Sequence, residues 1–376
     1  MKQKWFLFVI VVVSISILSS IDYVNEERER NRQITVYNTY AYQDGDEWVV
    51  PVKVWVHKKR RWLQGIASWT VRIMGEYNPQ EMIIFRERLT DLLADSKWRR
   101  DVTFTFSEDP NQKVYQLTDR DGNSLRTDRN GNIRGSLRIH ADSLSHLIDD
   151  ASGDVKLTLN ASARRYSGNG RVNFMKPEGL SVVSDIDDTV KETELPAGSQ
   201  IVVRNTFFIE YSAAEGMAEM YSNWSDASFH YVTGSPWQLY RSLSGFLFSD
   251  YAGFPEGTFH MKNARKNVTT ISSWRDLVEF VTNENLTFEQ KLGQIDQLFK
   301  HFPDREFILV GDSGERDPDI YRAIMNKYPD QIREVFIRDV VNDRELNPDR
   351  LEGMTIIPAP TIEFGVSRKR ENFELN

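Results

Sequence analysis

Two different hydrophobic patterns divide the chain. Between residues 30 and 176, short apolar runs rich in Val, Tyr and Trp are separated by polar turns, as at residues 34–37 and 49–56. Short strands broken by turn residues indicate a mostly β domain, for which we expect a sandwich. One segment of this region differs, because Phe85, Leu89 and Leu92 recur at helical spacing after the helix-start signal Asn78-Pro79.

From residue 179 to 362, apolar strands alternate with helical segments. Strands are expected near residues 182–184, 229–233, 258–261, 307–310, 335–338 and 354–357, and helices near 237–248, 288–301 and 320–327. This alternation predicts an α/β fold with a parallel sheet, beginning after a boundary at residues 176–179. Residues 363–376 are expected to form a polar tail.

The N-terminal 28 residues have the pattern of an export segment. Lys2 and Lys4 precede an apolar run over residues 5–18, and two serines and a polar stretch follow it. This order predicts a signal peptide or membrane anchor over residues 1–28. We therefore expect the protein to be exported across the cytoplasmic membrane, to a periplasmic or extracellular location, and to be either released or anchored.

Composition excludes several classes of chemistry. The 376 residues include no cysteine, which removes disulfides, thiol nucleophiles and thiolate zinc sites. A formal net charge of -8 argues against a general nucleic-acid binder. A basic cluster at residues 58–61 lies beside Trp55, Trp62 and Trp69, where a solvated turn is favoured over a lipid contact.

Polar side chains follow the apolar core of three predicted strands. The candidates are Asp185, Asp187 and Thr189 after the first strand, Thr233 and Ser235 after the second, Asp312 and Asp317 after a third, and Lys291 on a helix. Alternate residues of a strand point the same way, so Asp185 and Asp187 would share a face and repel each other. A divalent cation relieves such repulsion, and Mg²⁺ suits a site of carboxylates and phosphate. Parallel strand ends converge on one crevice, so all these groups are expected to meet there.

Three segments resemble a known enzyme family. They are SDIDDTVK at residues 184–191, YVTGSPWQL at 231–239 and FILVGDSGERDPDIY at 307–321. Their order and strand context resemble haloacid-dehalogenase-like phosphohydrolases. Within that superfamily they are similar to the catalytic domain of the actin-patch-associated phosphatidate phosphatases. The resemblance covers about half of the chain and implies a Rossmann-like parallel sheet with a small cap insert.

The resemblance also implies a role for each residue. Asp185 would be the nucleophile and form an aspartyl phosphate, and Asp187 would be the general acid and base. Thr233 and Lys291 would hold the phosphoryl oxygens. The Mg²⁺ ligands would be Asp185, Asp187 through its backbone carbonyl, and Asp312, with Asp317, Ser235 and Thr189 in support. Lys262 and Lys266 compete with Lys291 for its role, and Ser235 competes with Thr233.

These expectations lead to a Mg²⁺-dependent phosphatidate phosphatase that releases diacylglycerol and phosphate. A lipid phosphate substrate and a membrane surface are the expected partners, nucleic acid is not, and nothing indicates a protein partner. Apolar residues of the insert between Lys191 and Phe229 either admit acyl chains or pack the cap onto the domain. Two alternatives remain open, namely a phosphatase of a soluble phosphate monoester and an inactive module that binds a lipid headgroup.

Overall fold

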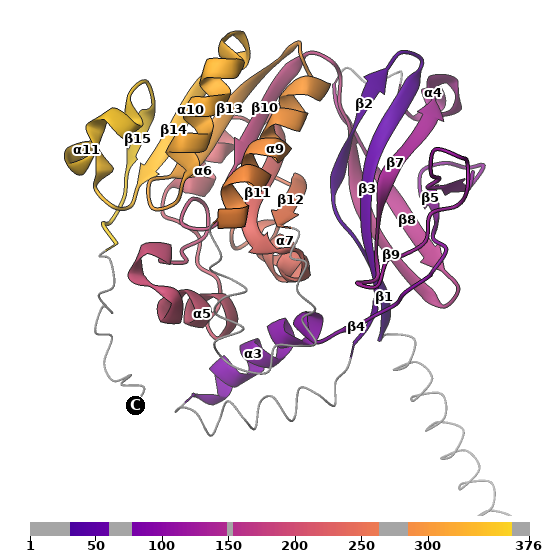
Figure 1. Ribbon diagram of the computed structural model, residues 1–376, viewed down its shortest axis with the longest axis horizontal. Helices are drawn as coiled ribbons and strands as arrows, with labels where there is room; N and C mark the ends of the chain where they lie inside the picture. The colour runs from indigo at the N-terminus through magenta and orange to yellow at the C-terminus, as the bar shows by residue number, and fades with distance from the viewer. Residues whose placement is uncertain (1–30, 60–76, 149–152, 263–284, 363–376) are drawn as a thin grey trace, which may run out of the picture.

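Two β-sheets lie side by side in the computed structural model, which describes residues 31–59, 77–148, 153–262 and 285–362 (Figure 1). The predicted export segment at residues 1–28 and the predicted tail at 363–376 lie outside the described residues. Within the described ranges, no helix has both the length and the apolar character needed to cross a membrane.

The first sheet has nine strands and confirms the mostly β N-terminal region. Its strands are β1 (Arg32–Val36), β2 (Thr39–Asp44), β3 (Glu47–Lys58), β4 (Asp95–Ser96), β5 (Thr103–Phe106), β6 (Tyr115–Gln116), β7 (Asn132–His140), β8 (Val155–Ala163) and β9 (Tyr166–Phe174). They form one connected sheet rather than the two separate sheets of a sandwich, because β1 and β2 each pair with both β3 and β9. Side chains from both halves of this sheet, including Val50, Phe104 and Phe174, fill one core.

Helix α3 (Pro79–Leu92) belongs to the N-terminal half in sequence but packs on the other half. It begins with a capping box, in which the Asn78 side chain accepts from the backbone N–H of Glu81 and Glu81 accepts from that of Asn78. Phe85 is buried and stacks on Phe208 with ring centroids 4.6 Å apart. The predicted helix is therefore confirmed, with its apolar face covering the C-terminal half of the chain.

The second sheet is parallel throughout and has six strands in the order β12-β11-β10-β13-β14-β15. These are β10 (Gly179–Ser184), β11 (Ser228–Pro236), β12 (Thr258–Lys262), β13 (Arg305–Asp312), β14 (Ile332–Asp339) and β15 (Thr355–Pro358). The main helices are α7 (Tyr240–Leu247), α9 (Asn285–His301) and α10 (Asp317–Lys327). The predicted strands and helices are confirmed. The succession of strands reverses between β10 and β13, where open α/β sheets form a crevice at their carboxyl edge.

Short helical segments complete the described fold. They are α4 (Ser145–Ile148), α5 (Ser199–Phe207), α6 (Met217–Ser222) and α11 (Asp343–Leu346), with 3-10 turns at Ala141–Ser143, Leu195–Ala197, Trp237–Leu239, Pro329–Gln331 and Pro348–Leu351. The insert between β10 and β11 contains α5 and α6. Its aromatic residues Phe207, Phe208 and Tyr221 are buried in the core beneath the insert. Of the two roles predicted for them, packing is the one observed.

The two halves share a hydrophobic core. Tyr37 and Trp55 of the first sheet lie in the same buried cluster as Val182 and Ile186 of the second. The Trp55 ring meets Trp237 edge-on with centroids 4.7 Å apart, and the Tyr37 hydroxyl donates to the Trp237 carbonyl at 2.9 Å. The N-terminal sheet is therefore held directly against the segment that follows β11.

Candidate active site

Asp185 occupies the first position after β10, at the carboxyl edge of the parallel sheet. The side chain is 1% exposed, and its backbone N–H donates to the carbonyl of Val310 on β13 at 2.9 Å. Ser184, the preceding residue, is aligned with Tyr231 of β11 and Val310 of β13. The ends of β10, β11 and β13 therefore meet around Asp185, as the sequence predicted.

The loop after Asp185 is folded by Asp188. This residue has a left-handed φ of +57°, and its carboxylate accepts backbone N–H bonds from Thr193, Glu194 and Leu195 at 2.6–2.8 Å. Arg338 of β14 donates to the Asp188 carbonyl at 2.8 Å. Thr189 is buried, and no described residue bonds its hydroxyl. These bonds return the chain toward the site at Lys191 and Thr193.

Lys291 of α9 joins three carboxylates. Its ammonium lies 2.7 Å from Asp185 Oδ1, 2.7 Å from Glu315 and 2.9 Å from Asp317. Gly311 at the end of β13 permits this approach, since a Cβ there would lie 2.7 Å from the Asp317 side chain. Of the competing lysines, Lys262 is buried at the end of β12, and Lys266 lies outside the described residues. Lys291 is therefore the lysine that the structure brings to Asp185.

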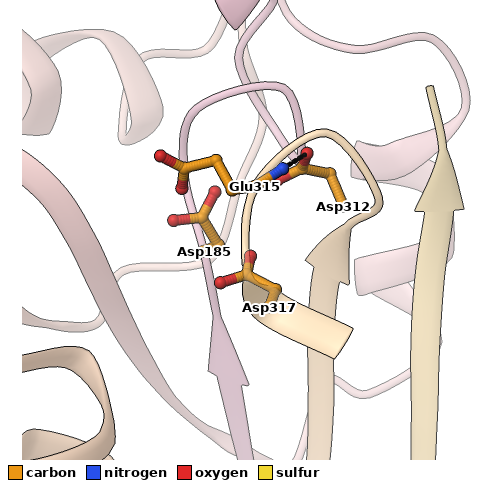
Figure 2. Close-up of side chains that lie close together, drawn as sticks. All are labelled: Asp185, Asp312, Glu315 and Asp317. Atoms are coloured by element: carbon orange, nitrogen blue, oxygen red, sulfur yellow. Dashed lines mark hydrogen bonds between the residues drawn. The ribbon is translucent and has the colours of Figure 1, made fainter. Parts of the chain in front are cut away.

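Asp185, Asp312, Glu315 and Asp317 form an acidic cluster in which one oxygen of each lies within 4.8 Å of the others. Figure 2 shows Asp185 after its strand, close to Asp312 at the end of the neighbouring strand and to Glu315 and Asp317 just beyond it. Asp312 Oδ1 accepts from the backbone N–H groups of Gly314 and Glu315. In the described part of the chain, Asp185 Oδ2, Asp312 Oδ2 and Asp317 Oδ2 are buried without a hydrogen-bond partner. Hard oxygen ligands of this kind fit Mg²⁺.

Burial makes this acidic cluster difficult to ionise. Burial raises the pKa of Asp185 well above its usual range, which Lys291 opposes and the neighbouring carboxylates reinforce. Burial and the proximity of Asp317 and Glu315 raise the pKa of Asp312 in the same direction. A single lysine cannot neutralise four carboxylates, so the cluster favours a bound cation.

Asp187 has the opposite surroundings. Its Oδ1 accepts from Lys191 at 2.8 Å and from the Thr193 hydroxyl at 2.7 Å. Its Oδ2 accepts from Ser235 at 2.9 Å and from Thr233 at 3.2 Å. Burial opposes ionisation of Asp187, but Lys191 and these hydroxyl bonds lower its pKa to about 2.

The structure thus sorts the predicted residues into two groups. Asp185, Lys291, Asp312 and Asp317 lie together, and Asp187, Thr233 and Ser235 lie together. Their catalytic and metal-binding roles remain predictions. Three residues that contact these groups were not predicted, namely Glu315, Lys191 and Thr193. Glu315 and Lys191 lie inside the quoted motifs, and their charge was the available signal.

Comparison with known proteins finds relatives of the C-terminal half of the chain. Residues 180–339 match the family model for the catalytic domain of phosphatidate phosphatase APP1. This stretch of the chain is similar in sequence to that catalytic domain. Phosphatidate phosphatase APP1 of Saccharomyces cerevisiae is 31% identical over 171 residues, which are 44% of this chain and 27% of that protein. The predicted resemblance to the actin-patch-associated phosphatidate phosphatases is therefore confirmed for the part of the chain that carries Asp185, Asp187 and Asp312.

Other comparisons add less. An uncharacterised protein of Schizosaccharomyces pombe is 31% identical over 178 residues, which are 46% of this chain and 27% of that protein. Both matches span only 27% of the curated relatives' length. A solved carbohydrate esterase structure is 9% identical and covers 83% of this chain and 89% of that chain. Its TM-score is 0.21, which is too low to indicate a shared fold.

Proposed function

We propose that this protein is a Mg²⁺-dependent phosphatidate phosphatase of the haloacid-dehalogenase-like type. The observation that carries the proposal is the placement of Asp185 beside Lys291 and three further carboxylates, in the stretch that matches the catalytic-domain family. A nucleophilic carboxylate, a fixed cation and a set of oxygen ligands together suit phosphoryl transfer.

Asp185 forms the bond to phosphorus in this proposal, and the bond from phosphorus to the leaving alkoxide breaks. Lys291 holds Asp185 Oδ1 in place and adds positive charge near the phosphoryl oxygens. The acidic cluster, with its three unpartnered oxygens, would hold Mg²⁺, joined by the Asp187 carbonyl. Bound Mg²⁺ supplies Lewis-acid polarisation of the phosphoryl group and offsets negative charge.

Asp187 moves protons in both halves of the reaction. In the first half it protonates the alkoxide, and in the second it takes a proton from the water that releases phosphate from Asp185. Its lowered pKa keeps Asp187 in the deprotonated form, which is the form that can receive that proton. Lys191 and the three hydroxyls that contact Asp187 fix its carboxylate for both transfers, and the proton gained in the second half serves the first half of the next turnover.

Phosphatidate is favoured as the substrate because the matched family and the yeast relative carry that activity in their names. The export segment predicted from the sequence would place the reaction outside the cytoplasmic membrane, against a lipid surface. The alternative is the same chemistry on a soluble phosphate monoester. An inactive headgroup-binding module does not need the paired arrangement of Asp185 and Asp187.

Phosphate release by the full chain tests this proposal directly. We expect release from detergent-dispersed phosphatidate that requires Mg²⁺, stops on chelation and falls by about 10⁴-fold or more in Asp185→Asn. Asp330→Asn, at an exposed position in the turn after α10, is the matched control and should retain activity. Release from a soluble monoester but not from phosphatidate would select the alternative substrate, and no release from either would reject the enzyme.

A further inference from the structure

The N-terminal sheet carries opposite charge at its two ends. At one end of β3, Glu47 lies opposite His140 of β7 in the strand register, and Asp44, Asp46 and Asp142 lie beside them. At the other end, Lys58 lies opposite Arg32 of β1 and Asp95 of β4 in the strand register. The segments that extend from this second end contain Lys97, Arg99, Arg100, Arg126 and Arg129.

Two turns at the basic end are bonded into one unit, which we term the paired turns (residues 97–100 and 126–131). The backbone N–H groups of Arg99 and Arg100 donate to the carbonyl and hydroxyl of Thr127, each at 2.9 Å. The N–H of Thr127 returns a bond to the Arg100 carbonyl at 3.0 Å. The backbone of the paired turns is therefore fixed, and it carries Trp98, Arg99 and Arg129 as exposed residues.

An unusual combination of side chains is exposed on the paired turns. Trp98 is 53% exposed, and the Arg99 guanidinium lies 5.1 Å from its ring centroid. Arg99 has a left-handed φ of +53°, and Arg129 is also exposed. Lys97 and Arg126 pair with Asp95 and Asp101. Arg99 and Arg129 are exposed, and no ion pair within the described ranges involves either of them, so their charge is available to an external anion.

Contacts link the paired turns to the catalytic edge. Ser96, immediately before the paired turns, accepts from Trp55 Nε1 at 3.2 Å, and Trp55 packs on Trp237. Trp237 directly follows β11, whose end places Thr233 and Ser235 on Asp187. In Figure 1, β4 and α3 lie at the same lower end of the molecule as α5, which follows the Asp185 loop. Arg32, at the start of β1, lies at this end too.

We propose that the paired turns dock on an anionic lipid bilayer. Tryptophan favours the headgroup region of a bilayer, and basic side chains are attracted to anionic lipid. The binding needs no catalysis, but its use rests on the proposed function, because docking at this end presents the carboxyl edge of the parallel sheet to lipid. The acidic end of the first sheet would face away from the bilayer.

Single-cysteine labelling tests the contact, because the natural chain has no cysteine. The full chain carries an environment-sensitive fluorophore either at Trp98→Cys or at Val114→Cys, an apolar position that is 62% exposed. Val114 follows Lys113, which bonds Ser143 near the acidic end. With phosphatidylglycerol vesicles, we expect a blue shift at position 98 and none at 114. Equal spectra at both positions would overturn the proposal, even for a chain anchored by its N-terminal segment.

Charge removal tests the electrostatic part. Each basic residue near an anionic surface contributes about 1 kcal/mol, so the Arg99→Gln, Arg129→Gln double variant should bind phosphatidylglycerol vesicles roughly thirty-fold more weakly. Arg333→Gln, an exposed arginine on β14, is the matched control and should bind as the unchanged protein does. Undiminished vesicle binding by the double variant would contradict an anionic bilayer as the partner.

Two further measurements distinguish a failure of the docking proposal from a failure of the proposed phosphatase function. Asp185→Asn should still give the blue shift at position 98, because the paired turns do not include the catalytic residues. The double variant should hydrolyse a monodisperse short-chain phosphatidate at the unchanged rate and lose activity only on vesicles. A loss of the same size on both substrates would overturn the docking role.

Discussion

Asp185 and Asp187 are two residues apart and both buried, but their surroundings are opposite. Asp185 shares one lysine with two other carboxylates and keeps an oxygen without a partner among the described residues. Asp187 has its own lysine and three hydroxyl donors, so each of its oxygens accepts two bonds. The group around Asp185 has one positive charge for four carboxylates, whereas both carboxylate oxygens of Asp187 have all their partners in place.

This difference suggests that the group around Asp185 binds a cation, while the group around Asp187 positions one carboxylate. Excess carboxylate charge around Asp185 is relieved by protonation or by a bound cation, so the acidic cluster is suited to binding a cation. The four bonds to Asp187 fix its carboxylate in one orientation before any substrate arrives. A short strand end can therefore carry two carboxylates with different tasks because their neighbours come from different strands and helices.

Removing each lysine gives the strongest test of the comparison. Lys291→Met leaves two buried carboxylates and the partly buried Glu315 without their shared cation, and it should lower the free energy of unfolding by about 3–5 kcal/mol in chelator. Lys191→Met leaves Asp187 with three hydroxyl donors, and its loss should be smaller, about 1–3 kcal/mol. Denaturant unfolding measures both, and equal losses would contradict the distinction.

Metal addition should act on the acidic cluster alone. At a hundredfold excess over its dissociation constant, Mg²⁺ should stabilise the protein by about 2.7 kcal/mol, seen as a higher thermal midpoint. Asp312→Asn should abolish this shift. It should also make the metal-free protein more stable, because one repelling charge is removed from the cluster. An unchanged Mg²⁺ shift in Asp312→Asn would rule out this ligand.

Lys191 should influence the reaction according to the leaving group. Because Lys191 fixes Asp187, which protonates the leaving group in the proposed reaction, Lys191→Met should slow hydrolysis of alkyl phosphates by about a hundredfold and of a good aryl leaving group much less. Thr193→Val, which removes a bond to the same Asp187 oxygen, should act in the same direction, and Thr193→Ser should retain activity. A loss of the same size on both esters would leave Lys191 a purely structural role.

In metal-free protein, the pH dependence of stability that comes from Asp187 should have the opposite sign to that from Asp312. The folded pKa of Asp187 is about 2, below its usual value, so its contribution is present above about pH 4 and is lost as pH falls toward 2. The loss should be about 2 kcal/mol and absent in Asp187→Asn. The pKa of Asp312 is raised by burial, so its effect runs the other way, with stability lost as pH rises. Unfolding at several pH values in chelator measures both, and a parallel dependence would contradict the comparison.

The sequence predicted the parallel sheet and its edge well. Val182 and Val183 form a short apolar run after Gly179, and the polar residues that follow each apolar run lie where the strands end. Hydrophobic periodicity is a local property, and here local pattern and tertiary structure agree. The nucleophile candidate Asp185 and its lysine could therefore be located before the structure was known.

The sequence could not predict which side chains would meet. Lys191 reaches Asp187 because Asp188 adopts a left-handed conformation and captures three N–H groups further along the chain. Glu315 reaches Lys291 through the geometry of the segment after β13. The capping signal at Asn78 and Glu81 predicted α3, but its partner Phe208 is 123 residues beyond Phe85 and comes from the insert. Contacts of this range depend on the whole fold.

The core shared by the two halves has a consequence for expressing the catalytic half alone. A fragment starting at Gly179 would lose Tyr37, Trp55 and α3, and the aromatic surface that they cover would be open to water. It would also lose Asp154, which pairs at 3.0 Å with Arg305, a residue that is 2% exposed. The stretch that matches the family is therefore not a unit that can be cut at its sequence boundary. A soluble fragment needs the first sheet, or a designed replacement for its apolar and charged contacts.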